Sequence, residues 1–146
     1  MSTRRSLHDS DFYAWSLEQA ALLRAGRVGE ADLAAIAEEI ESMGKTEKRE
    51  LVSRLTVLLL HLLKWERQPA GRGNSWRLSI ANARDEIADL LADNPSLKTV
   101  LDEVTASAYR YARRKAAIET DIGEEGFPGQ CPWSFAQAMD AGSWPE

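Results

Sequence analysis

Carboxylates and one histidine are the side chains whose chemistry could bind a metal ion. Helical proteins hold such ions with glutamates and a Glu-x-x-His pair that project from neighbouring helices. The candidates lie on the first three predicted helices: Glu18, Glu38, Glu39, Glu41 and His61. If predicted helices 30–43 and 46–65 form a hairpin that turns near Lys45, His61 lies roughly 13 Å along the axis from the glutamates of its partner helix. The chain also has no Glu-x-x-His pair. We therefore expect no metal and no cofactor, and we assign these carboxylates to ion pairs with arginines.

His61 interrupts the apolar run 57–63, which predicts a buried imidazole. A buried imidazole needs partners for its ring nitrogens. The same hairpin geometry places His61 level with Ser79 and Tyr109, so we predict His61 and Tyr109 as buried polar residues. A structural hydrogen bond to Ser79, Tyr109 or Glu30 is the expected role of His61. Catalysis would need a nucleophile or a second base within reach, and the sequence indicates none.

Aromatic and cationic side chains alternate in the segment 109–115, a pattern that is typical of some nucleic-acid-binding proteins. Cations late in a helix also complement its dipole, and Tyr111 falls on the apolar stripe of the predicted helix. The net charge of −5 opposes binding to phosphates. We therefore expect no nucleic-acid binding. Arginine and tryptophan are enriched in the binding hot spots of protein interfaces, so we predict a protein-interaction surface that contains Arg110, Arg113, Arg114 and Trp144.

Six helical segments position these side chains. Apolar residues at helical spacing predict helices at about 9–25, 30–43, 46–65, 74–90, 95–118 and 134–139. Asp9 or Ser10 is expected to cap the first helix, while Gly26 and Gly44 are expected to end the first and second. The helix 46–65 is apolar almost all round, which is typical of the centre of a bundle.

The expected fold is therefore all-α. We predict a compact antiparallel bundle of five helices plus a short C-terminal helix, because short connections join consecutive helices. Residues 9–146 are expected to form this single domain, and residues 1–8 a flexible N-terminal tail. No stretch alternates apolar and polar residues over the length of a strand.

The composition fits a globular protein, with 44% hydrophobic and 28% charged residues among 146. Cys131 is the one cysteine, which excludes an intrachain disulfide and a zinc site built from several thiols. No apolar run approaches the ~20 residues that span a bilayer, and no apolar core of a secretion signal follows Arg4 and Arg5. We expect a cytoplasmic protein that does not bind a membrane.

Six blocks of the sequence together resemble a known family: Phe12–Ala20, Glu38–Gly44, Leu58–Trp65, Ser75-Trp76, Phe127-Pro128 and Cys131–Trp133. They are similar to a bacterial family known as domain of unknown function twenty-nine. The resemblance extends from about Asp9 to Met139. It implies an almost entirely helical protein without an established activity, and it transfers no catalytic or binding residue.

The function we expect is that of a non-enzymatic protein-interaction module, with another protein or a second copy of the chain as partner. The alternative is an enzyme or a nucleic-acid-associated accessory protein that uses the basic end of the fifth helix. A flat surface bearing tryptophan and leucine would favour the module, and a concave pocket of mixed charge would favour the alternative. An apolar cavity between helices would indicate a ligand-binding bundle.

Overall fold

The computed structural model describes residues 6–146, and every regular element in that range is helical, which confirms the all-α class. The α-helices are α1 (Leu7–Ser10), α2 (Phe12–Arg24), α3 (Leu33–Arg67), α4 (Asn74–Asp93), α5 (Leu101–Thr120) and α6 (Phe135–Met139). Short 3₁₀ helices join them: η1 (Val28–Glu30), η2 (Pro69–Gly71), η3 (Pro95–Val100) and η4 (Glu124–Gly126). The elements belong to two compact units, an N-terminal unit up to Lys45 and a C-terminal unit from Thr46 to Glu146.

The chain before α2 differs from the prediction. Residues 1–5 of the predicted tail lie outside the described residues, and Leu7 and His8 begin α1. The predicted caps, Asp9 and Ser10, are themselves part of α1. The cap of α2 is Asp11, whose extended backbone breaks the helix and whose carboxylate accepts from the Ala14 N–H at 3.0 Å.

The two glycines that were expected to end helices behave differently. Gly26 follows the end of α2 with a φ of +73°, a left-handed conformation that favours glycine. Gly44 instead lies inside α3, so the predicted helices 30–43 and 46–65 are one helix and the predicted hairpin near Lys45 is wrong. A glycine costs a helix interior only about 0.5–1 kcal/mol, which the favourable residues on either side outweigh.

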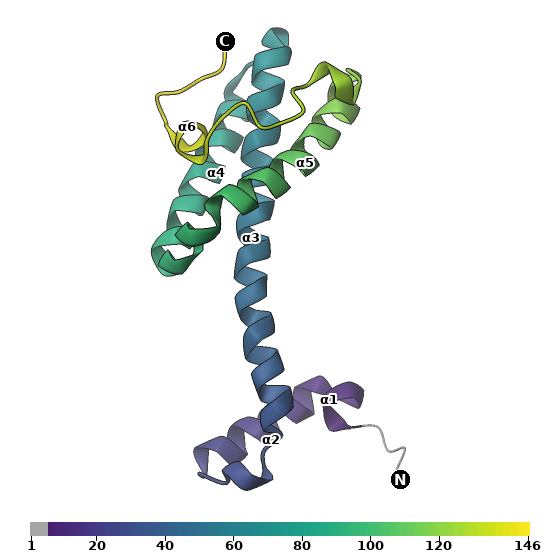
Figure 1. Cartoon of the computed structure of the whole chain (residues 1–146), viewed down its shortest axis with the longest axis vertical. Helices are drawn as coiled ribbons and strands as arrows, with labels where there is room; N and C mark the ends of the chain where they lie inside the picture. The colour runs from purple at the N-terminus through teal and green to yellow at the C-terminus, as the bar shows by residue number, and fades with distance from the viewer. Residues whose placement is uncertain (1–5) are drawn as a thin grey trace. The chain divides into compact units, whose positions relative to one another are not determined.

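The N-terminal unit consists of α1, α2, η1 and the beginning of α3 (Figure 1). Gln19, which is buried on α2, accepts from the Asp32 N–H at 2.7 Å. Asp32 in turn accepts from the Ala35 N–H at 3.1 Å and so satisfies a donor in the first turn of α3. These two bonds fix the start of α3 relative to α2.

The C-terminal unit holds the hydrophobic core, which α3, α4 and α5 share. In Figure 1, α4 runs back along the second half of α3 and α5 reverses direction again. Leu58 and Leu62 are 0% and 1% exposed, which confirms the central place predicted for this part of α3.

The structure corrects the predicted start of α5 and confirms the predicted N-terminal cap of α6. The residues after Asn94 form η3, so α5 begins at Leu101 instead of Pro95. The predicted cap of α6 is confirmed, because Ser134 and Gln137 form a reciprocal capping box.

Candidate functional site

A pocket of about 500 Å³ lies between one face of α5 and the segment that follows η4. Side chains spaced three or four residues apart along α5 form one wall, because such residues share a helix face: Asp102, Thr105, Ala106, Tyr109, Arg110 and Arg113. Glu124 and the segment 129–135 form the opposite wall. All of these residues belong to the C-terminal unit.

Tyr109 fixes the distance between the two walls. Its side chain is buried, and its hydroxyl donates to the Pro128 carbonyl at 2.5 Å. Burial raises the pKa of Tyr109 to about 12, so the phenol stays a neutral donor at physiological pH. Cys131 lies on the opposite wall with a half-buried thiol, and burial raises its pKa as well.

Two polar atoms at the pocket lack a hydrogen-bond partner within residues 6–146. Arg113 donates from Nη2 to the Phe127 carbonyl at 3.3 Å, but its buried Nε–H has no acceptor. The Thr105 hydroxyl is also unpartnered, although the side chain is only 7% exposed. Because buried polar groups are nearly always hydrogen-bonded, both atoms require an explanation.

Two of the three arginines predicted to share a surface lie together. Arg110 and Arg113 both line the pocket, and the Arg110 guanidinium also lies over the Tyr111 ring, 5.1 Å from its centroid. Arg114 is exposed and lies beside a separate shallow depression. Tyr111 is itself exposed, so its predicted position on the core stripe is wrong: the buried face of α5 passes through Tyr109 and Ala112 instead.

Trp144, the fourth predicted surface residue, is partly covered. Its ring packs against the Trp65 ring at an interplanar angle of 44°, with centroids 4.6 Å apart, and 38% of the residue stays exposed. The Arg84 guanidinium lies 5.5 Å from the same ring. Arg84 is buried, and it donates to the Ala138 carbonyl at 2.9 Å and to the Ser143 carbonyl at 3.1 Å. Burial lowers the pKa of Arg84, against the opposing effect of Asp140.

His61 is half-buried, and its Nδ1 lies 2.8 Å from the Val57 carbonyl of the preceding turn. This local contact differs from the long-range bonds to Ser79, Tyr109 or Glu30 that were predicted. The hairpin error explains the loss of one expected partner, Glu30, which a continuous α3 places far along the helix from His61. The ring bonds instead to the carbonyl four residues earlier in its own helix.

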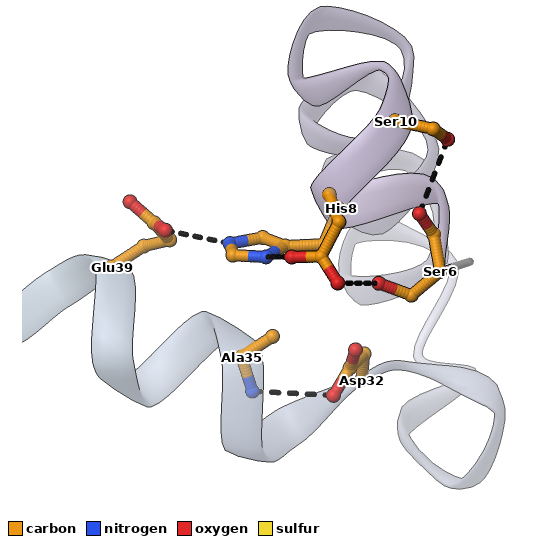
Figure 2. Close-up of polar contacts among 7 residues, drawn as sticks. Ser6, His8, Ser10, Asp32, Ala35 and Glu39 are labelled. Atoms are coloured by element: carbon orange, nitrogen blue, oxygen red, sulfur yellow. Dashed lines mark hydrogen bonds and ion pairs between the residues drawn. The ribbon is translucent and has the colours of Figure 1, made fainter.

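His8, which the sequence analysis did not single out, is the centre of a contact cluster in the N-terminal unit. Its Nε2 lies 2.6 Å from a Glu39 carboxylate oxygen, as Figure 2 shows, and its ring packs edge-on against Trp15 at 4.5 Å. The Glu39 bond raises the pKa of His8. His8 and Glu39 are 31 positions apart in the chain, so no local sequence pattern indicates this pair.

The N-terminal unit exposes many large apolar side chains. They are 37–75% exposed: Leu7, Phe12, Tyr13, Leu17, Leu23, Val28, Leu33, Ile40 and Met43. On α3, Leu33, Ile36, Ile40 and Met43 follow one another at intervals of three, four and three residues; we name these four the α3 stripe. Of these four residues only Ile36 is half-buried, and the other three are exposed.

Comparison with known families agrees with the sequence resemblance. The family described as "Domain of unknown function DUF29" matches residues 7–144, nearly the whole chain. The chain belongs to the DUF29 family. The DUF29 match spans both units and includes His8, the α3 stripe and the pocket. No curated protein and no solved structure matches the chain.

Within residues 6–146, no three histidine, cysteine, aspartate or glutamate side chains gather as ligands for a metal ion. The hairpin from which we argued against a metal site is absent, however, since the glutamates of residues 38–41 and His61 lie on one continuous helix. The helices of the same range also include none that is long and apolar enough to cross a membrane.

Proposed function

We propose that this DUF29 chain is a non-enzymatic protein-interaction module, and that its α3 stripe binds a second copy of the chain. The observation that carries the proposal is the exposure of the stripe. Leu33, Ile40 and Met43 are 50%, 63% and 68% exposed, although they follow the apolar spacing of a helix that packs against another helix.

The small core of the N-terminal unit supports the same proposal. Of residues 6–45, only Trp15 and Gln19 are buried. Units of about 40 residues usually require disulfides, metals or oligomerisation, because too little of their surface is removed from water. Cys131 is the single cysteine and belongs to the other unit, so no disulfide stabilises this one.

A second copy is the partner we favour because the α3 stripe is complementary to itself. Two identical helices with apolar residues at alternating intervals of three and four can interdigitate about a twofold axis. Full burial of one large apolar side chain contributes about 1.5–3 kcal/mol, and each copy contributes the same side chains. The contact is short, so we expect a dissociation constant of about 1–100 µM.

The alternative, an enzyme or a nucleic-acid-associated protein that uses the basic end of α5, has one observation in its favour, the pocket of mixed charge beside α5, but less support overall. Phosphate binding by that helix would require its cations to act together. Arg110 is instead stacked on Tyr111, and Arg113 bonds to the Phe127 carbonyl. Of these three arginines, only Arg114 is both exposed and absent from the pocket lining.

Sedimentation equilibrium of the full chain over about 1–500 µM tests the proposal. The wild-type protein should form dimers as the concentration rises, and Ile40→Glu should weaken the dimer at least about tenfold because it places a charge in the contact. Leu78→Glu is the matched control, since Leu78 on α4 is 61% exposed and lies in the other unit.

Three results would contradict the proposal: a wild-type protein that remains monomeric at every concentration, an Ile40→Glu variant that dimerises like the wild type, or a Leu78→Glu variant that loses the dimer equally. A monomer would indicate that another protein, or another part of the chain, covers the stripe. Circular dichroism of each variant verifies that its helix content is unchanged.

A further inference from the structure

We propose that the pocket beside α5 binds a small organic anion that carries an aromatic ring. The proposal concerns the C-terminal unit and is independent of the α3 stripe. The volume of about 500 Å³ suits a small molecule, because ligand sites of proteins usually enclose about 300–1,000 Å³.

An unpartnered charged donor indicates an anion. The Nε–H of Arg113 has no partner within residues 6–146, and Arg113 lines the pocket. The Thr105 hydroxyl also lacks a partner, but Thr105 lies eight positions earlier, or roughly 12 Å along the helix axis, so one anionic group cannot contact both residues. The Nε atom is enclosed, so the guanidinium must turn toward the pocket before an incoming carboxylate or phosphate oxygen can supply the acceptor that Arg113 lacks; arginine is well suited to both groups.

The two acidic residues of the pocket limit where an anion can bind. Asp102 precedes Arg113 by eleven residues, or roughly 16 Å along the helix axis. Glu124 lines the pocket, but no acceptor, Glu124 included, reaches the Nε–H of Arg113. The anionic group is therefore expected next to Arg113, and the carboxylate of Asp102 faces the distal part of the pocket.

The opposite wall indicates an aromatic ring. Trp133 and Phe135 line the pocket and are both half-buried, so their faces offer apolar surface to a ligand. Aromatic pairs gain attraction beyond the burial of their area. A ring attached to an anionic group would contact this wall and Arg113 together.

The first measurement is an NMR titration of the full ¹⁵N-labelled protein with phenylacetate, phenyl phosphate and the neutral phenylacetamide. At least one anion should shift the indole N–H signal of Trp133 and bind at least about tenfold more tightly than the amide, as expected for a charge-assisted hydrogen bond. The tighter of the two anions identifies the class, carboxylate or phosphate. Equal binding of anion and amide would overturn the proposal, and so would the absence of binding up to about 10 mM, which would indicate a pocket that holds only water.

Variants locate the binding. Arg113→Met should weaken the anion about tenfold or more, whereas Arg114→Met is the matched control, because Arg114 is the adjacent cation and does not line the pocket. Equal losses in both variants would overturn the proposal. Arg113→Lys keeps the test valid if Arg113→Met fails to fold, because it keeps the positive charge but loses the planar fork of N–H groups that suits a carboxylate or phosphate. It should weaken the anion about threefold or more and leave the binding of phenylacetamide unchanged; equal losses for the anion and the amide would contradict us.

Cys131 provides a second readout that does not depend on spectral assignment. It is the only thiol of the chain and lies on the pocket wall, so intact mass spectrometry reports its modification alone. A saturating anion should slow its reaction with N-ethylmaleimide, and the same concentration of phenylacetamide should slow it less. An unchanged rate at saturation would place the binding elsewhere and overturn the assignment.

Discussion

Replacing Gly44 by alanine tests the continuity of α3 directly. The residue lies in the interior of the helix, and a Cβ built on it meets no other atom within 4 Å. Alanine should therefore fit without strain and stabilise the helix by about 0.5–1 kcal/mol, the difference between alanine and glycine in a helix interior. If Gly44 instead ended a helix in the left-handed conformation, alanine would cost about 1–2 kcal/mol.

The assay has to report on this part of the chain, since the two units need not unfold together. Hydrogen exchange of the backbone amides of residues 44–48 does so. The stabilisation corresponds to a decrease of about two- to fivefold in their exchange rates. Global unfolding followed by circular dichroism should show an increase of about 2–4 °C if the transition is cooperative.

Gly26→Ala is the matched comparison. Gly26 has a φ of +73°, so the same substitution should destabilise the protein by about 1 kcal/mol. Faster exchange of residues 44–48 in Gly44→Ala would refute a continuous α3 and restore the hairpin. Opposite signs for the two variants are the expected result.

Two further predictions concern the core and the His8 cluster. Leu62→Ala should destabilise the protein by about 2–5 kcal/mol in a denaturant titration, because Leu62 is 1% exposed in the core; a loss below about 1 kcal/mol would contradict its central place. The pKa of His8 should lie above 6.5, and Glu39→Gln should lower it toward that value, which an NMR titration of the two histidines would detect. Because folding raises this pKa, the contribution of His8 to the stability of the fold is complete below about pH 6.5 and is lost as the pH rises through its folded-state pKa. After correction for the intrinsic effect of pH on amide exchange, the amides of α1 should therefore exchange faster at about pH 8.5 than at about pH 6.

The sequence was sufficient to predict the helices of the C-terminal unit, because the faces that carry apolar residues at helical spacing are the faces that the folded unit buries. Leu58 and Leu62 combine helical spacing with burial, and the Ser134 cap satisfies its donor locally. Gly26 and Gly44 mark the limit of this reasoning. Both are glycines at the end of an apolar stripe, and only the backbone conformation distinguishes a helix end from a helix interior.

The candidate sites depended on contacts that local patterns do not encode. His8 bonds to Glu39, and Tyr109 bonds to a carbonyl 19 residues later, so neither partner could be found by spacing. Arg84 did leave a signal: it follows Ile80 by four residues on the apolar face of α4, where a cation must find partners. The pocket could not be predicted, because one of its walls depends on the path of the segment after η4, and that segment has no periodic pattern.

The partners of Arg84 also constrain the order in which the C-terminal unit can fold. The guanidinium is buried on α4, but the carbonyls of Ala138 and Ser143 that it binds lie 54 and 59 residues later in the chain. An intermediate in which α3, α4 and α5 have packed before this last segment arrives would contain a buried charge without acceptors, which is strongly unfavourable. The helix α6 and the segment after it must therefore dock before, or together with, the final closure of the core around Arg84. Long-range contacts of this kind slow folding, and they make the docking of the C-terminal residues a condition for the completed native state.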